Sequence, residues 1–531
     1  MKTIPLVPIA LSALVVGHAP AGAAELFLTS DNCMACHNGL VTAKGEDVSI
    51  GIDWRGTMMA NAARDPYWQA SVRREVGEHA PAGAAIENEC SLCHMPMAHV
   101  QTRAEGRSAS VFAHLVRGTR SPRAALARDG VSCSVCHQIE PDKLGKPESF
   151  VGGFVVEATG KLPRRAFGPF EVKPALARLM ASATNFLPAA AEHVRSAELC
   201  ATCHTLITEA LDKDGKVIGR LPEQVPYLEW LASAYRDGPS CAGCHMSPVS
   251  EPVAVANLLS EPRAGVDRHE FLGGNFVSPA LLKRLATPMP ALPLELDRAA
   301  AAVRKHLTEA AAQLAIAGLQ VKEGVLEARI TVENATGHKL PTAYPSRRAW
   351  LHIAVKDGAG GLVFESGAVG RNGTIAGNDN DADPGRFEPH YQTIEQPGQV
   401  QIYEAILGDV QGRVTTGLLH AVTYLKDNRI VPVGFDKQKA PADVAVHGEA
   451  LADEDFADGS DRIVLRIPVG PSPPPYRVEV ELLFQPIGYR WAENLRSVPG
   501  AEPRAFSRVF DELAAIAYQR LARVERVTGE N

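Results

Sequence analysis

The sequence is organised around Cys133-Ser134-Val135-Cys136-His137, which reads C-x-x-C-H. This pattern is the attachment signal for c-type haem. The two thiols form thioether bonds to the haem vinyl groups, and the adjacent imidazole ligates the iron from the proximal side. The two-residue gap lets both sulfur atoms reach one porphyrin edge while the chain turns and brings the histidine beneath the ring. The stretch therefore predicts a covalently bound haem with His137 as its proximal ligand.

The same motif recurs along the N-terminal half of the chain, and its five copies are Cys33/Cys36/His37, Cys90/Cys93/His94, Cys133/Cys136/His137, Cys200/Cys203/His204 and Cys241/Cys244/His245. Together they use all ten cysteines of the chain. A single C-x-x-C is also typical of redox dithiols and of half a zinc site. Five copies, each followed by histidine and with no cysteine to spare, indicate five covalently attached haem c groups.

Histidines outside the motifs are the natural sixth ligands of the irons. Of 17 histidines in the chain, the ones left within residues 24–275 after the proximal set are His79, His99, His114, His193 and His269. One distal ligand for each iron would make a bis-histidine pentahaem protein. His99 follows His94 too closely to bind the same iron from the other side, so it would have to serve a neighbouring haem. For each of them, a surface or propionate-bonding role is the alternative.

Other side chains compete for the same role. Met58 and Met59 are alternative thioether ligands, which would raise the haem potential relative to two imidazoles. His338, in Gly337-His338-Lys339-Leu340-Pro341, is a further alternative if the C-terminal part folds back onto the haems. Methionines that directly follow motifs are expected to pack against the rings instead, and these are Met95, Met97 and Met246.

Length, charge and the N-terminus indicate an exported protein. At 531 residues the chain is too long for one ordinary domain, and its net charge of -7 excludes a basic footprint for nucleic acid. Lys2, an apolar run at 4–16 and Ala21-Gly22-Ala23 form a signal peptide over residues 1–23. Its retention as an anchor is the alternative, but the run is too short to span a bilayer comfortably. We expect a periplasmic or otherwise exported bacterial protein without a membrane span in the mature chain.

The expected fold class is α+β and multidomain. Residues 24–275 form a pentahaem domain that is mostly helical or irregular, because haems supply much of its buried apolar surface. Helices are expected at 65–76, 175–183 and 227–235. Residues 276–318 form a helical connector, within which one long helix over 294–317 carries His306.

Beyond residue 320, apolar and polar residues alternate with period two, which is typical of strands. An antiparallel β-sandwich is expected over 319–490, with strands at 325–332, 350–355, 400–406, 463–469 and 476–484. Residues 491–531 would close the chain with an amphipathic helix over 506–527.

Two polar stretches of the expected sandwich have open interpretations. Asp379 to Gly385 starts like a calcium loop, but Pro384 and His390 stand where an EF-hand needs Gly and Glu. A looser Ca²⁺ site and an acidic solvated turn remain. The pairs Arg347-Arg348 and Lys426 to Arg429 would bind haem propionates, dock a partner or form structural ion pairs.

The chain resembles multihaem c-type cytochromes, and within them the exported cytochrome c554-like type with an appended β-sandwich. The stretches that carry the resemblance are 90–97 (CSLCHMPM), 130–139 (GVSCSVCHQI), 199–206 (LCATCHTL), 240–246 (SCAGCHM), 269–275 (HEFLGGN), 334–351 and 424–435. The resemblance implies mostly low-spin haems in close pairs that pass electrons between redox proteins acting as donor and acceptor. It fixes neither the partners nor the oligomeric state.

Two functions from different classes follow. The first is an electron carrier, which the five regular motifs favour. The second is an oxidoreductase in which one five-coordinate haem acts on a small nitrogen or sulfur compound. The discriminating feature is an iron without a sixth protein ligand. A filament subunit is a third, weaker interpretation, against which the bulky sandwich argues.

The motif count predicts the mass of the mature protein. Five haems should add about 3 kDa to the processed chain, on the order of 0.6 kDa each. Intact mass spectrometry under denaturing conditions retains covalent haem and measures this directly. A fully matured protein that carries four haems or fewer would contradict the motif count.

Overall fold

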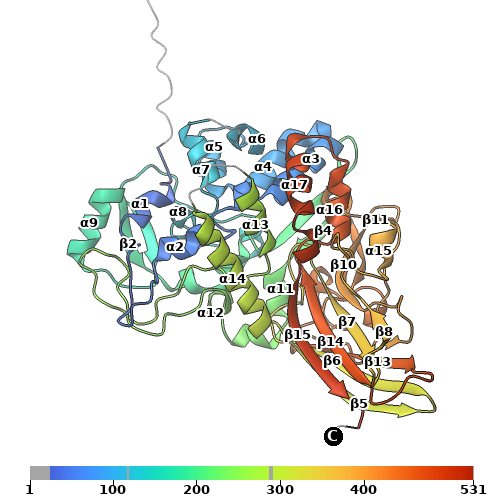
Figure 1. The fold of residues 1–531 in the computed structure, drawn as a ribbon. Helices are drawn as coiled ribbons and strands as arrows, with labels where there is room; N and C mark the ends of the chain where they lie inside the picture. The colour runs from blue at the N-terminus through green and yellow to red at the C-terminus, as the bar shows by residue number, and fades with distance from the viewer. Residues whose placement is uncertain (1–23, 116–118, 286–290, 530–531) are drawn as a thin grey trace, which may run out of the picture.

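The computed structural model describes residues 24–115, 119–285 and 291–529. Figure 1 shows a helical, loop-rich part that contains all five motifs beside a sheet-rich C-terminal part, with α14 (Pro293–Ala310) lying between them. The chain therefore has the expected α+β, multidomain fold. The expected signal peptide, residues 1–23, lies outside the described residues.

The motif-bearing part consists of short helices joined by loops. Its helices are α1 (Ser30–Met34), α2 (Ile50–Arg55), α3 (Pro66–Glu78), α4 (Gly83–His94), α5 (Pro96–Ala104), α6 (Val111–Leu115), α7 (Pro122–Arg128), α8 (Cys133–Cys136), α9 (Pro174–Thr184), α10 (Ala197–Ala201), α11 (Pro226–Leu231) and α12 (Cys241–His245). Two small sheets accompany them: a parallel pair of β1 (Arg164–Gly168) with β2 (Phe186–Ala190), and an antiparallel pair of β3 (Leu206–Leu211) with β4 (Val217–Gln224).

Local signals account for the longer helices. The Asp65 carboxylate accepts a hydrogen bond from the Tyr67 N–H (2.9 Å) and caps α3, whose first residue is proline. Helix α9 ends at Asn185, which adopts the left-handed conformation usual for a C-cap. The helices expected at 65–76 and 175–183 are confirmed. The third, expected at 227–235, ends at Leu231 and continues as a separate 3₁₀ turn.

The C-terminal part is built on two sheets. One has the order β5 (Ala312–Lys322), β6 (Val325–Asn334), β13 (Ser460–Pro468) and β9 (Thr393–Ile394). The other has the order β11 (Val414–Thr415), β10 (Ile402–Gly408), β7 (Arg348–Lys356), β14 (Arg477–Gln485) and β15 (Gln519–Val527), with β8 (Leu362–Ser366) and β12 (Thr423–Asp427) paired off this path.

These two sheets share one hydrophobic core, as in a β-sandwich. Ile330 and Leu465 from one sheet and Ile353 and Val480 from the other are fully buried within it. Each of the five expected strands lies largely within an observed strand. The sandwich is antiparallel except where β9 pairs with β13 in parallel.

The expected long helix over 294–317 is wrong in its second half. Helix α14 stops at Ala310, and β5 starts at Ala312 and pairs along β6. The Ala- and Leu-rich composition favours helix, but residues 312–322 lie at the sheet edge, where pairing to β6 outweighs intrinsic propensity. Gly318 adopts a left-handed conformation within the register shift of this strand.

The expected C-terminal helix over 506–527 is also wrong in part. Helices α16 (Tyr489–Arg496) and α17 (Ala501–Asp511) form, but residues 519–527 are strand β15, paired with β14. Its charged residues Arg520, Arg523, Glu525 and Arg526 are exposed or partly exposed on the sheet surface. Arg520, for example, pairs with Glu481 of the neighbouring strand (2.9 Å).

The two parts of the chain pack together through α17 and α3, which lie side by side in Figure 1. The Phe506 ring of α17 is fully buried and lies 5.3 Å from the Tyr67 ring of α3, measured between centroids. Tyr67 also meets Tyr344 of the C-terminal part edge-on at 5.8 Å. This aromatic contact fixes how the sheets meet the motif-bearing helices.

Replacing Phe506 by alanine tests this contact. We expect a loss of about 3–5 kcal/mol in the free energy of unfolding, because a fully buried aromatic ring leaves a cavity. Urea unfolding followed by circular dichroism measures the change. The exposed Ile516→Ala is the matched control and should change stability by less than about 0.5 kcal/mol. Equal stability of the two variants would contradict a packing role.

Candidate haem-binding site

The five motifs lie next to one another in space. Thiols of different motifs lie close enough to interact, and the pairs are Cys33 with Cys133, Cys93 with Cys203, and Cys200 with Cys241. Cys136 also lies close enough to Cys200 and Cys203 for their charges to interact. All ten cysteines are free of disulfides. The third motif therefore connects the first to the fourth, and the fourth adjoins the second and the fifth.

The sequence predicts that Cys36 binds haem together with Cys33. A loop that contains Asn257 packs against the turn that carries Cys36. The Cys36 N–H donates to the Cys33 carbonyl (3.1 Å), and the Cys36 carbonyl accepts from the Asn257 N–H (2.8 Å). The side chain is partly buried. Haem attachment at Cys36 therefore stays a sequence prediction.

Cys90 and Cys244 each interact with the other thiol of their own motif. The charge of Cys90 acts on Cys93, and the charge of Cys241 acts on Cys244. Cys244 is exposed, whereas Cys90 is partly buried. The two predicted attachment points are thus placed beside their motif partners, and their bonds to haem likewise stay sequence predictions.

The proximal imidazoles are oriented by backbone carbonyls from other segments. Nδ1 of the ring hydrogen-bonds to the Val255 carbonyl at His37 (2.6 Å), to the Ala62 carbonyl at His94 (3.3 Å) and to the Phe167 carbonyl at His137 (2.5 Å). His245 makes the same kind of bond to the Leu272 carbonyl. Donating Nδ1–H to a carbonyl fixes the tautomer that leaves Nε2 free for a metal. These residues therefore fit a haem iron.

His269 lies opposite the proximal histidine of the third motif. The ring centroids of His137 and His269 are 6.4 Å apart, and the ring planes differ by 18°. Two imidazoles on one metal should have centroids roughly 6 Å apart, since each metal–nitrogen bond is about 2.0 Å and each ring centre lies about 1.1 Å beyond. Burial lowers the pKa of His269 to about 4, so the ring is neutral and able to ligate. The pair fits the two sides of one haem.

The fifth motif has two histidines at the same kind of distance. The centroid of His245 lies 6.2 Å from that of His338, with planes 20° apart, and 6.0 Å from that of His306, with planes 54° apart. His338 precedes the sheet residues of β7, and His306 lies on α14. The sequence pattern of α14 did not single out His306 as a ligand, because only folding brings that helix face to the motif.

A buried ion network holds the loop that carries His338. Glu229 of α11 accepts hydrogen bonds from the Lys339 N–H (3.0 Å) and from the Thr342 hydroxyl, and it pairs with Arg429 (3.1 Å). Lys339 Nζ pairs with Asp427 (2.7 Å), which also receives two bonds from Arg429 (2.8 and 2.7 Å). The motif-bearing part thus binds the sandwich loop directly beside His338.

His79 and His99 are both buried and hydrogen-bonded. The His79 ring is fully buried, and its two nitrogens lie 3.2 and 3.3 Å from the Glu75 and Leu211 carbonyls. His99 is 4% exposed, and its Nδ1 contacts the Ser91 hydroxyl at 2.9 Å. Neither ring opposes a motif imidazole among the described ring contacts. Their ligand roles stay sequence predictions.

The remaining expected ligands have different surroundings. His114 has a buried Nε2 that lacks a hydrogen-bond partner among the described residues, which suits a ligand. His193 donates Nε2–H to the Ile139 carbonyl (2.8 Å) and meets the Phe167 ring. Met58 packs in an apolar cluster with Leu282, so its side chain is engaged elsewhere. Met59 contributes its carbonyl, which accepts the Val131 N–H.

The basic residues of the stretches 347–348 and 426–429 differ in whether they pair with a carboxylate. Arg348 binds Asp381 with two hydrogen bonds (2.7 and 3.0 Å), and Lys426 pairs with Glu404 (3.0 Å), so both are structural ion pairs. Arg347 has no carboxylate partner among the described residues. The Asp381 pairing also gives calcium no support at 379–385, since this carboxylate is neutralised by Arg348.

A buried polar cluster in the sandwich was not recognised from the sequence. His390, Asp453 and Asp461 bring ligand atoms within 4.8 Å of one another. However, His390 Nδ1 accepts hydrogen bonds from the side-chain amides of Gln401 (2.9 Å) and Asn428 (3.1 Å). The ring proton is therefore on Nε2, which donates to Asp453 (3.0 Å) and is not free for a metal. The cluster is a hydrogen-bonded network of the core.

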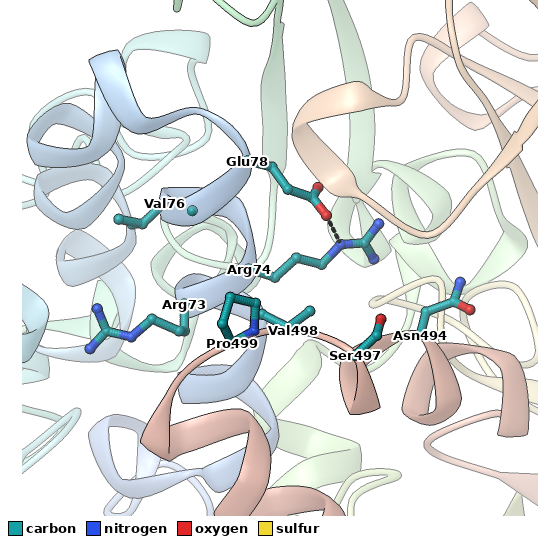
Figure 2. A pocket seen from close by; sticks show the side chains of 9 residues that line it. Arg73, Arg74, Val76, Glu78, Asn494, Ser497, Val498 and Pro499 are labelled. Atoms are coloured by element: carbon teal, nitrogen blue, oxygen red, sulfur yellow. Dashed lines mark hydrogen bonds and ion pairs between the residues drawn. The ribbon is translucent and has the colours of Figure 1, made fainter.

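A surface cleft of about 490 Å³ lies between α3 and the segment that joins α16 to α17 (Figure 2). Arg73 pairs with Glu502 and Arg74 with Glu78, both at 2.9 Å. Because carboxylates already neutralise both cations, the cleft is not a ready anion site. No motif residue lines it.

Comparison with known proteins identifies the fold. The chain has the fold of a multihaem cytochrome. It is similar to a penta-heme cytochrome c552 from Thermochromatium tepidum, with a TM-score of 0.55 and 15% identity over 94% of this chain and 98% of that chain. The match therefore extends beyond the motif-bearing part. No family model and no curated protein sequence matches the chain. Within the described ranges, no helix is both long and apolar enough to cross a bilayer.

Asp427 provides a test of the network that holds the His338 loop. Burial alone would raise the pKa of this carboxyl, but Arg429 and Lys339 outweigh burial and hold the pKa below its ordinary value. Asp427→Asn should cost about 3–5 kcal/mol at pH 7, because it leaves buried cations unpaired. A carboxyl with a lowered pKa stabilises the fold above about pH 4 and loses that contribution as the pH falls further.

Urea unfolding of both proteins at pH 7, 5 and 3.5 measures this effect. The difference between the wild type and Asp427→Asn should be constant from pH 7 to 5 and shrink at pH 3.5. The exposed Asp436→Asn serves as control, since its carboxyl pairs with the surface residue Lys439 and accepts the Gln438 N–H. A difference that grows on acidification would contradict the assignment.

Proposed function

We propose that this chain is an exported pentahaem c-type cytochrome that passes electrons between redox proteins. The observation that carries the proposal is the contiguity of the five motifs, which thiol contacts join into one connected cluster. Porphyrins attached at adjoining thiols lie close together, so electrons can move from one to the next. The similar structure is a penta-heme cytochrome c552, which supports the same haem count.

Bound haem c supplies one-electron chemistry between ferric and ferrous iron. The residues of this chain attach the groups, orient the proximal rings and exclude water. His37, His94, His137 and His245 are held by carbonyl acceptors, and His269 and His338 would serve as distal ligands, which their ring distances to His137 and His245 support. Two imidazoles on an iron keep it six-coordinate, which suits transfer without substrate binding.

In this proposal the sandwich contributes to haem binding. Through His338 it supplies a distal ligand to the fifth haem, and Glu229 fixes the ligand loop from the motif-bearing side. The sandwich would then be a lid on the fifth haem as well as a surface for partners.

A second candidate function is catalysis at an open iron, and one observation favours it. Among the described ring contacts, the proximal rings of His37, His94 and His204 face no other histidine. The ring of His94 instead stacks on Trp68 (4.2 Å between centroids). Beside the second motif, burial raises the pKa of Glu223 to about 7, which makes this carboxyl a potential proton donor. A small nitrogen or sulfur compound is the expected substrate.

Electron paramagnetic resonance of the oxidised protein tests the ligand assignments. His269→Ala and His338→Ala should each convert one low-spin haem to high-spin, whereas His306→Ala should leave the spectrum unchanged. His352→Ala, a sandwich histidine bound to Glu365 and Glu481, is the control. An unchanged spectrum in His338→Ala together with a new high-spin signal in His306→Ala would transfer the role to α14.

The wild-type spectrum separates the two functions. Five low-spin signals support the carrier. A stoichiometric high-spin signal that shifts on adding nitrite, hydroxylamine or sulfite would contradict the carrier and favour catalysis.

A further inference from the structure

Three arginines beside haem motifs, Arg164 buried and Arg64 and Arg347 partly buried, lack a carboxylate partner. Arg164 is 5% exposed, and its Nε and Nη2 have no hydrogen-bond partner. Arg64 has an unpartnered, buried Nε. Arg347 donates one hydrogen bond from Nη1 to the Thr342 carbonyl (3.1 Å). None of the three forms an ion pair with a carboxylate of the described residues. Burial lowers the pKa of Arg64 and of Arg347 to about 10.

Other arginines in the interior of the chain are paired with carboxylates. Arg348 is bound to Asp381, Arg429 to Asp427 and Glu229, and Arg268 to Asp53. A buried cation without an anion is strongly destabilising. The guanidinium group also matches a carboxylate with two parallel hydrogen bonds. The partner of each unpaired arginine is therefore expected to be a carboxylate that the polypeptide does not supply.

Each of these arginines adjoins the carbonyl that orients a proximal histidine. Arg64 is two residues from Ala62, the acceptor for His94. Arg164 lies on β1 three residues from Phe167, the acceptor for His137, which is about 10 Å along a strand. That separation is comparable with the reach of a haem from its iron to its propionate arms.

Arg347 has the equivalent place at the fifth motif. Leu272 accepts the His245 proton, and two residues later a Cβ on Gly274 would lie 3.4 Å from Arg347 Nη1. The charge of Arg347 also acts on the His245 and His338 rings. A glycine here lets the guanidinium approach the turn that borders the fifth motif.

We propose that Arg64, Arg164 and Arg347 bind propionate carboxylates of the haems attached at the second, third and fifth motifs, respectively. Each guanidinium neutralises a propionate and places a positive charge beside one porphyrin. That charge favours the ferrous over the ferric iron and raises the potential of the haem it contacts. The inference rests on the proposed attachment of haem at these motifs.

The test is a redox titration of the intact, haem-loaded protein, followed by its optical spectrum and by electron paramagnetic resonance. Arg164→Gln should shift one haem transition to lower potential and leave the others in place. Arg347→Gln should shift a different transition. Arg165→Gln is the matched control on the same strand, because Arg165 is exposed and paired with Glu140; it should shift none.

Lysine variants separate an effect of lost charge from an effect of misfolding. Arg164→Lys and Arg347→Lys keep the charge, so their transitions should lie close to the wild-type values. Intact mass of each variant reports haem loading independently, so a wild type lacking haem at these motifs would contradict the proposed function rather than this inference.

Two results would overturn the inference. One is a set of fully loaded glutamine variants whose transitions all match the wild type, or lysine variants shifted as far as the glutamine ones. The other is a structure of the haem-loaded protein with these guanidinium groups beyond hydrogen-bonding distance of every propionate oxygen.

Discussion

The hydrogen bond from a motif imidazole to a distant backbone carbonyl is the constraint on which the motif-bearing part depends. His37 reaches Val255, which is 218 residues away in the chain. His245 reaches Leu272 and His137 reaches Phe167, so loops with little regular structure are tied to the motifs they cover. These bonds tie a region poor in long helices and large sheets to the motif histidines, and this helps it keep one geometry.

Buried ion pairs hold the junction between the motif-bearing part and the sandwich. Glu229 is fully buried and would be costly alone, but it meets two hydrogen-bond donors and Arg429 in the same place. Because Lys339 and Asp427 complete the network, no member can move without leaving another charge unpaired. The loop with His338 is therefore set as firmly as a strand, although it contains no regular structure.

The sequence predicts those features that are repeated or periodic. The five C-x-x-C-H motifs and the strands at 325–332 and 476–484 follow from spacing alone. Residues 312–317 and 519–527 were expected to be helical because their composition favours helix, yet 312–317 pair with β6 and 519–527 with β14. His306 and the carbonyl acceptors were missed because their contacts are not local. The acceptors lie 27 to 218 residues from their histidines, and contacts at such separations leave no local pattern.

The contacts among the motif thiols have a topology as well as a proximity. Thiols of the first motif interact with those of the third, thiols of the third with those of the fourth, and thiols of the fourth also with those of the second and fifth. The motifs therefore form a branched arrangement with the fourth motif at its junction, rather than a linear one. Under the proposed function, electrons that move between the haems of the first, second and fifth motifs would pass the fourth motif.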